Sequence, residues 1–277
     1  MIRIVTDSSA DLPSDLVARH GIVVVPLTIR FGDEEYVDGQ DLDRSAFWPK
    51  LTASEVLPET AAPPAGMFQD AFLDLAEGGA TGVVAVTLSS HVSGTYQSAA
   101  IAAEKVADTI PVTVADSESV SMATGFQVLE AARAAAAGRS LTEVVATTAA
   151  CRSTTNIFAT LDTLEFLKRG GRVGNAAAFF GSLLNVKPLI TFAGGAVAAA
   201  GRARTRSKAV AAVVAHVAGL GEIEELAVLH GSVPDLEAFT DMLAVHVDRD
   251  RMFPAELGPV VGTHAGPGVI GVAYRTR

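Results

Sequence analysis

Residues 82–95 read GVVAVTLSSHVSGT, and this stretch decides the predicted fold. The uncharged, valine-rich run from Gly82 to Leu88 is typical of a strand that is buried on both faces. An alanine-rich helix is expected from about Thr95 to Val106, followed by a strand at Val112 to Ala115 and a helix at Val120 to Ala137. Strands that alternate with helices predict right-handed βαβ units and a parallel sheet.

The same alternation precedes this stretch. Ile2 to Thr6 is a short strand, and the next helix opens at Pro13 and ends near Gly21, in keeping with proline at a helix start and glycine just past a helix end. The remaining predictions in this half are a strand-like run at Ile22 to Ile29 broken by Pro26, a hairpin or extended loop at Arg30 to Gly39, a non-helical proline-rich segment at Pro58 to Gly66, and helices at Met67 to Ala76 and Leu141 to Ser153.

After Asn156 the pattern loosens into a mixed α+β arrangement. The predicted segments are strands at Ile157 to Thr160, Glu225 to His230, Val260 to Thr263 and Val269 to Tyr274, helices at Leu161 to Leu167, Ala176 to Leu184, Ser207 to Ala218 and Leu236 to Val245, and a hairpin at Ile190 to Ala200. A boundary near Cys151–Asn156 would divide the chain into two domains, residues 1–155 and 156–277. The predicted fold class is therefore α/β, with a parallel-sheet N-terminal domain and a mixed α+β C-terminal domain.

Composition and charge exclude several classes of protein. The 277 residues are 49% hydrophobic and 19% charged, so the chain can bury a core and is not disordered. A formal net charge of −10, without a strong local basic patch, disfavours nucleic-acid binding. The single cysteine, Cys151, excludes an internal disulfide and fits a reducing compartment. Asp7 comes too early for a signal peptide, and no run of about 18 uncharged apolar residues suggests a membrane segment, so we expect a soluble cytoplasmic protein.

Serine-rich turns follow three of the predicted strands, beginning at Asp7, Ser89 and Asp116. In a parallel sheet such turns gather at the carboxyl ends of the strands, where open α/β folds bind ligands, although serine and aspartate also serve as helix caps. The middle turn, from Ser89 to Thr95, carries hydroxyls at four of seven positions directly before a helix, whose free N–H groups favour anions. Hydroxyls without a lysine or arginine suit a carboxylate better than a triphosphate.

A second candidate site is the glycine-rich loop from Gly262 to Gly268, which surrounds His264. A lone histidine is commonly structural, so both interpretations stay open. An enzyme would use His264 as general base and Ser93 as nucleophile or phosphate ligand, with Asp7 or Asp116 as the orienting group. The sequence has no phosphate-binding loop, no H-E-x-x-H, no C-x-x-C and no G-x-S-x-G, and its six histidines are scattered, so no metal site is expected.

Together these motifs resemble the DegV family of bacterial fatty-acid-binding proteins over nearly the whole chain, from about Ile4 to Gly271. The most specific segment is Leu88 to Ser90 with Ser93 to Ala99. The other matching motifs follow in the family's order: Thr6 to Ser9 with Asp11 to Pro13, Val25 to Leu27, Tyr36 with Asp38-Gly39, Asp116-Ser117, Leu164 to Val173, Lys187-Pro188, Arg204-Thr205 and Gly262 to Gly268.

The resemblance implies that a long-chain fatty acid lies between the two domains and that no cofactor is needed. The family holds the carboxylate by the serine of an S-G-T motif, here Ser93 with Gly94 and Thr95, and by a threonine, here Thr60. The family's histidine, here His264, joins this polar network.

The resemblance also implies a carrier without turnover of its own. Where the host has a fatty-acid kinase, that partner phosphorylates the presented carboxylate to an acyl phosphate. Arg172 and Arg204 are expected contacts for the kinase or the phosphorylated head group, with solvated surface arginines as the alternative. Nothing in the resemblance implies an oligomer, so a monomer is expected.

One departure from the family concerns the residues after Thr60. Ala61 and Ala62 stand where the family usually has serine and glutamine, which leaves fewer polar groups to support the threonine. The expected tunnel wall comprises Phe179, Phe180, Leu183, Leu184 and the segment Leu161 to Leu167, with ordinary core as the alternative for any one of them.

Overall fold

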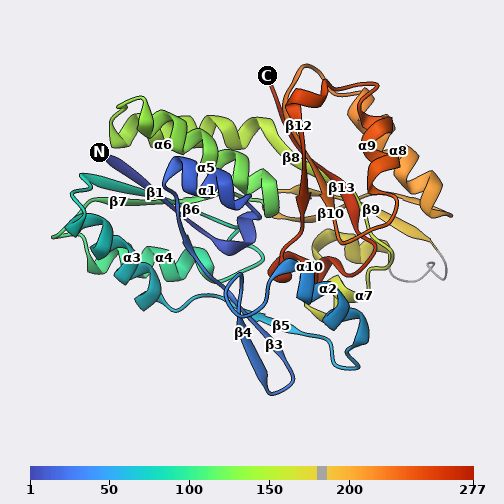
Figure 1. Cartoon of the computed structure of the whole chain (residues 1–277), viewed down its shortest axis with the longest axis horizontal. Coiled ribbons are helices and arrows are strands. Elements are labelled where there is room, and N and C mark those ends of the chain that lie inside the picture. The colour runs from blue at the N-terminus through green and yellow to red at the C-terminus, as the bar shows by residue number, and fades with distance from the viewer. Residues whose placement is uncertain (180–185) are drawn as a thin grey trace.

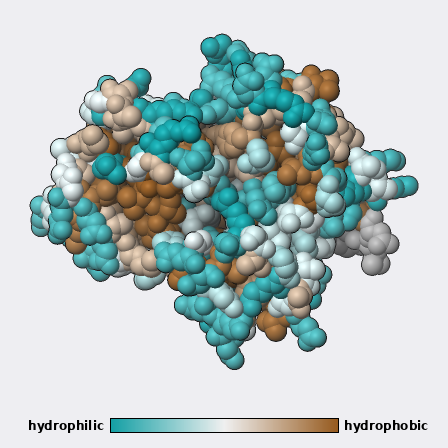
Figure 2. All heavy atoms as spheres, viewed as in Figure 1, coloured by the Kyte–Doolittle hydropathy of each residue, from teal (hydrophilic) through white to brown (hydrophobic). Residues whose placement is uncertain are grey.

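The computed structural model describes residues 1–179 and 186–277, with side chains through residue 176 and from residue 186 onward. Two large sheets lie on opposite sides of the molecule, and a small hairpin sheet projects below them (Figure 1). Figure 2 shows that this hairpin is covered by hydrophilic residues, whereas apolar residues gather at the edge of the first sheet.

The first large sheet is parallel, as predicted, and has the strand order β2-β1-β6-β7. Its strands are β1 (Ile2–Asp7), β2 (Val23–Val25), β6 (Gly82–Thr87) and β7 (Val112–Asp116). All six residues of β6 are buried, because helices cover both faces of the sheet. Successive residues of β1 face opposite layers: Ile4 belongs to the same buried cluster as Phe126, and Val5 belongs to the same cluster as Phe68.

The helices of this half form two layers around the first sheet (Figure 1). One layer comprises α3 (Ala65–Glu77) and α4 (Thr95–Lys105), and the other comprises α1 (Ser14–His20), α5 (Ser121–Ala136) and α6 (Leu141–Thr154). Helix α5 also contacts β8 (Thr155–Thr160) and β13 (Ile270–Thr276) of the second sheet. Twelve of its sixteen residues are buried, so α5 forms the shared centre of the molecule.

The segment between β2 and α3 forms a small antiparallel sheet in the order β4-β3-β5, together with one helix. The elements are β3 (Thr28–Phe31), β4 (Glu34–Val37), α2 (Arg44–Ala53) and β5 (Glu59–Ala61). The predicted hairpin after Arg30 is confirmed, and the proline-rich segment is extended rather than helical. Helix α2 is absent from the predictions. Its N-cap is Asp43, whose carboxylate accepts a hydrogen bond from the Ala46 N–H.

The second large sheet has six strands in the order β10-β9-β8-β13-β11-β12. Its further strands are β9 (Lys187–Ala193), β10 (Ala196–Ala203), β11 (Ile223–His230) and β12 (Met252–Glu256). Only β11 and β12 pair in parallel, so the predicted mixed arrangement is confirmed. Helices α8 (Arg206–Ala218) and α9 (Leu236–Leu243) cover one face, and the other face turns toward α5.

Two predicted segments after Asn156 are wrong. The run Val260 to Thr263 is not a strand but lies in helix α10 (Pro259–Ala265), because Pro259 occupies the first turn of the helix and outweighs the β preference of two valines. The predicted helix Leu161 to Leu167 is shorter: Leu161 continues the sheet through its N–H bond to Pro188 O, and helix α7 spans only Glu165–Arg169.

The remaining short elements are the 3₁₀ helices η1 (Ser8–Ala10), η2 (Gly174–Phe179) and η3 (Arg249–Arg251). The predicted helix Ala176 to Leu184 therefore corresponds to η2 at its start and lies beyond the described residues at its end. Among the helices of the described residues, none is long and apolar enough to cross a membrane.

Candidate functional site

A cavity lies between the two large sheets, and its empty space together with the solvent at its opening amounts to about 800 Å³. Apolar side chains from both halves of the chain form most of the wall. They are Leu27, Leu88, Val92, Val120, Ile157, Ala159, Leu161, Leu167, Ile190, Phe192, Val197, Leu229, Leu257, Val260, Val261, Ala265 and Val269.

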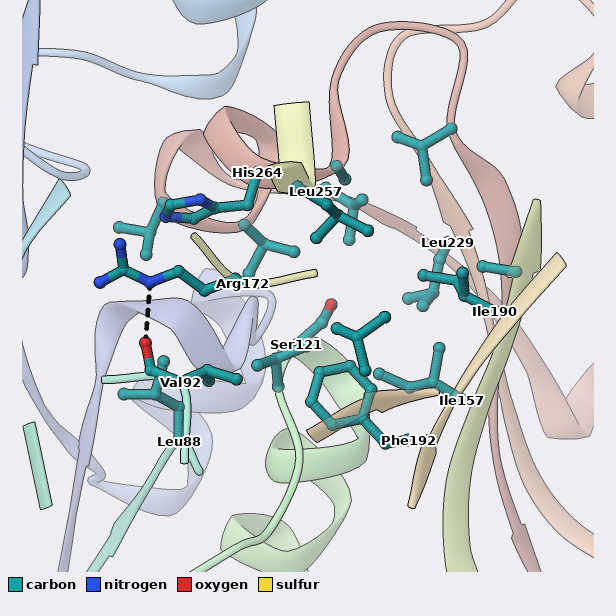
Figure 3. Close-up of a pocket in the computed structure, with 18 of the residues that line it drawn as sticks. Leu88, Val92, Ser121, Ile157, Arg172, Ile190, Phe192, Leu229, Leu257 and His264 are labelled. Carbon is teal, nitrogen blue, oxygen red and sulfur yellow. Dashed lines mark hydrogen bonds between the residues drawn. The ribbon is translucent and has the colours of Figure 1, made fainter. Parts of the chain in front are cut away.

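Most polar residues of the cavity gather at one end, and Ser121 lies between the two ends. Figure 3 shows His264 and Arg172 beside Val92 on one side, and Ile190, Leu229, Ile157 and Phe192 on the other. Thr60 from β5 and Ser93 from the loop before α4 also line the wall. The structure thus brings together four predicted site residues from separate parts of the chain, and it gives the cavity a polar end and an apolar end.

Thr60 and His264 are hydrogen-bonded to each other. The distance from Thr60 Oγ1 to His264 Nε2 is 2.9 Å. Burial, with a smaller effect of the Arg172 charge, lowers the pKa of His264 to about 4, so the imidazole is neutral at physiological pH. Nδ1 is buried and has no partner among the described residues. A proton on Nε2 would donate to Thr60 Oγ1 and leave the threonine's own hydrogen free for a ligand.

Gly170, at the end of α7, makes room for the His264 ring. A Cβ atom at this position would lie 2.3 Å from His264 Nδ1 and 2.8 Å from Cε1, which is closer than any real contact. The main chain of Gly170 also receives a hydrogen bond of 2.6 Å from Arg172 Nη1. The segment after α7 therefore fixes both the histidine and the arginine of the polar end.

Ser93 is held by Thr95. The two hydroxyls are 2.9 Å apart, and the Thr95 N–H donates to Ser93 Oγ at 3.3 Å. Thr95 is fully buried and does not line the cavity, so it orients Ser93 rather than facing the cavity itself. Gly94 also lies outside the lining, and a Cβ there would meet only Ala62 Cβ, at 4.0 Å.

Several other hydroxyls and acids of the serine-rich turns bind the protein itself. Ser89 Oγ donates to Gly195 O at 2.6 Å and so attaches the β9–β10 hairpin tip to the turn. Asp7 accepts hydrogen bonds from Ser9 and from the Leu88 N–H, and Asp116 accepts from the Ser90 N–H. Neither acid orients His264, so the arrangement lacks the acid–base pairing that the enzyme hypothesis names.

The two candidate arginines lie in different places. Arg172 donates from Nε to Val92 O at 3.0 Å and lines both the cavity and an adjoining polar depression. That depression shares Thr60, Arg172 and His264 with the cavity and adds Arg169 and Glu59. Arg204 lines a separate surface depression, with Lys187 and Asp162 among its other residues.

The cavity wall includes two of the residues predicted for the tunnel wall and several that were not predicted. Leu161 and Leu167 line the cavity, whereas Phe180, Leu183 and Leu184 and the side chain of Phe179 lie outside the described residues. The prediction missed the wall residues of α10. Once this segment is placed on a helix, the signal is visible: Val260 and Val261 lie four and three residues before His264, which is the spacing of one helix face.

Metal and thiol chemistry have little support in this part of the molecule. No group of three or more histidine, cysteine, aspartate or glutamate side chains in the described ranges could hold a metal ion. Cys151 is buried, and burial raises the pKa of its thiol to about 12, so the thiolate is not available at neutral pH.

Fold and cavity together define a class of two-lobed α/β proteins with an internal apolar cavity that is polar at one end. A family model described as "Uncharacterised protein, DegV family" matches residues 1–277, and the chain belongs to the DegV family.

Relatives and solved structures match along the whole chain. The DegV domain-containing protein of Streptomyces coelicolor is 37% identical over 286 residues, which is 100% of this chain and 99% of that protein. The fatty-acid-binding DegV family protein of Thermus thermophilus is 35% identical, with a TM-score of 0.90 over 100% of this chain and 99% of its own. The stearic-acid-binding protein of Eubacterium ventriosum is 26% identical, with a TM-score of 0.89 over 99% and 98% of the two chains.

Proposed function

We propose that this protein binds a long-chain fatty acid in the cavity, with the carboxylate at the end formed by Ser93 and Thr60. The observation that carries the proposal is the cavity itself, whose wall is mostly apolar and which has Arg172 and the hydrogen-bonded pair Thr60 and His264 at one end. The solved structures from Thermus thermophilus and Eubacterium ventriosum, both of which bind fatty acids, support the same ligand class.

The acyl tail supplies most of the affinity. Each buried CH₂ contributes about 0.8 kcal/mol, so twelve would contribute roughly 10 kcal/mol before the entropy of association is subtracted. A hydrogen bond to a charged group contributes about 1.5–3 kcal/mol. Ser93 and Thr60 therefore mainly set the orientation of the chain, and they place the carboxylate at the polar end.

We further propose that the bound carboxylate is presented to a fatty-acid kinase and that the protein turns over no substrate alone. The polar depression that adjoins the cavity gives a route to the carboxylate, and Arg172 lies at the junction of the two. Arg172 and Arg204 would contact the kinase or the phosphorylated head group. In this proposal the protein is a cytoplasmic monomer, and its two domains meet between residues 155 and 156.

Native mass spectrometry of the purified protein tests the ligand. We expect a stoichiometric added mass equal to a fatty acid of about 14–18 carbons, whose identity is read after denaturation. A protein that is free of ligand and stays so after incubation with fatty acids would contradict the proposal. It would favour a phosphorylated metabolite and the Ser93–His264 enzyme hypothesis.

The kinase step has a separate test. The loaded protein is incubated with a bacterial fatty-acid kinase and ATP, and acyl phosphate is trapped with hydroxylamine. We expect the trapped product only when protein, kinase and ATP are all present. Product formed by the protein without the kinase would show that it is itself an enzyme.

A further inference from the structure

Asp11 belongs to a motif that the ligand site leaves unexplained. Its side chain is 1% exposed, and its φ of +53° lies in the left-handed region, which few residues other than glycine adopt. Both carboxylate oxygens accept hydrogen bonds. Oδ2 accepts from Ser121 Oγ at 2.6 Å, and Oδ1 accepts from the Gly258 N–H at 2.8 Å. The partners are 110 and 247 residues away in the chain, so this carboxylate joins remote segments.

These two partners are the starts of two helices that form the cavity. Ser121 is the first residue of α5, lines the cavity itself and lies between its polar and apolar ends in Figure 3. Gly258 is the N-cap of α10, the helix that carries His264. Asp11 therefore connects the wall of the cavity with the helix that supplies its polar end.

Two further features fit this connection. Ser121 has a φ of +50°, a strained conformation for serine, and such strain persists where the surroundings enforce it. At Gly258, a Cβ atom would lie 2.8 Å from Asp11 Oδ1, so a larger residue would push the carboxylate away. The Arg44 guanidinium, 4.0 Å from Oδ1, partly balances the buried charge.

We infer that Asp11 is a positioning residue of the fatty-acid site, which fixes the helix that carries His264 relative to the cavity wall at Ser121. This inference rests on the proposed function. Asp11 lies outside the lining of the cavity and acts through its two partners. Without it, α10 and the start of α5 lose their common anchor, and the Thr60–His264 pair shifts relative to the tail-binding wall.

Two substitutions of Asp11 separate the effect of its charge from the effect of its two hydrogen bonds. Asp11→Asn preserves both contacts, because the amide oxygen accepts from Gly258 and the amide nitrogen donates to Ser121 Oγ. Asp11→Ala removes both. We expect the dissociation constant for stearate to rise at least about tenfold in Asp11→Ala, which is the lower end of the effect of losing hydrogen bonds to a charged group. In Asp11→Asn it should stay within about threefold of the wild-type value. Asp38→Ala is the matched control, because Asp38 is a buried carboxyl close by that touches neither helix start.

A second measurement distinguishes positioning from general stability. The ¹⁵N NMR shift of His264 Nε2 in the unliganded protein reports the bond to Thr60. We expect it to change in Asp11→Ala and to match the wild type in Asp11→Asn and Asp38→Ala. Ser121→Ala cuts only the link to α5, so it should weaken stearate binding and leave the His264 shift unchanged. If Asp11→Ala does not fold, Gly258→Ala replaces it, because its Cβ displaces the same carboxylate.

Folded Asp11→Ala or Gly258→Ala protein with wild-type stearate affinity and an unchanged His264 shift would overturn the inference. Failure of the wild type to bind stearate would instead contradict the proposed function. The His264 shift in unliganded protein would still test Asp11 in that case.

Discussion

Ser93 and Ser90 lie in the same turn but in different surroundings. Ser93 Oγ lines the cavity and is oriented by Thr95, whereas Ser90 is exposed and bonds only through its main chain to Asp116 among the contacts described. We predict that Ser93→Ala weakens fatty-acid binding roughly tenfold to a hundredfold, as expected for a lost hydrogen bond to a carboxylate. Ser90→Ala should bind like the wild type. Titration calorimetry with stearate measures both, and equal affinities would place the carboxylate elsewhere.

Gly170 allows a second prediction at the scale of one residue. The Cβ of Gly170→Ala would displace the His264 ring and break its 2.9 Å bond to Thr60. We expect fatty-acid affinity to fall roughly three- to tenfold, the effect of losing one neutral hydrogen bond. Gly66→Ala is the control, because a Cβ at Gly66 meets nothing within 4 Å and the residue lies in helix α3. A wild-type affinity of Gly170→Ala would mean that His264 does not support the site.

Sequence alone predicted residues that lie at the polar end of the cavity, but not all of the residues that support them. Ser93, Thr60 and His264 stand in motifs, so their residue types could be recognised before their contacts were known. Ser121 could not be found in this way, because its place on the cavity wall depends on a left-handed backbone conformation and on a partner 110 residues away. Asp7 was ambiguous for a related reason: a carboxylate after a strand serves a ligand or the main chain equally well, and here it binds the Leu88 N–H.

Among the elements, the first sheet was predictable and helix α10 was not. The uncharged, valine-rich composition of β6 is typical of a buried strand, and the helices on either side have clear starts and ends. Helix α10 spans only seven residues and contains two valines, one threonine and one glycine, so local preference disfavours a helix. Its helical form is fixed by Pro259 and by the Asp11 bond at Gly258, which only the folded chain provides.

The hairpin formed by β9 and β10 supplies Ile190, Phe192 and Val197 to the cavity wall, and its tip is attached through Gly195 to Ser89. In Gly195→Ala, a Cβ would lie 2.7 Å from His91 Cδ2 and 2.8 Å from Ser89 Oγ. We predict that the tip detaches and that fatty acid is released about tenfold faster, as expected when the bound state is destabilised by about 1.4 kcal/mol.

Gly194→Ala is the matched control for this prediction. Both glycines have positive φ, so both alanine variants carry similar backbone strain, but a Cβ at Gly194 meets nothing within 4 Å. Stopped-flow displacement with a fluorescent fatty acid measures the release rate. Equal release rates in the two variants would show that strain in the hairpin, and not its contact with Ser89, controls release.

At the scale of the whole molecule, buried titratable groups make stability depend on pH in opposite directions. Burial raises the pKa of Asp38 to about 7 and that of Asp11 to about 6, from a usual value near 3.8. Burial lowers the pKa of His264 to about 4 from 6.5. The two aspartates reduce stability as the pH rises, because the native state holds protons that the unfolded chain has already released. His264 acts in the opposite sense: it reduces stability as the pH falls below 6.5.

Asp38→Asn isolates one of these effects. Well below pH 3.8 the Asp38 carboxyl is protonated in both the native and the unfolded state, so wild type and variant should differ little in pH dependence. Between pH 4 and 7 the wild type loses stability through Asp38, whereas the neutral amide of the variant does not titrate. The variant's free energy of unfolding should therefore rise relative to that of the wild type across this window and remain higher, relative to its value at low pH, above pH 7. Urea unfolding at a series of pH values measures the difference.

Parallel curves for the two proteins would mean that Asp38 titrates alike in both states and that water reaches it in the native protein. Because Asp38 touches neither helix start of the cavity, stearate affinity should stay unchanged while stability shifts, which separates the electrostatics of the buried acids from the geometry of the ligand site.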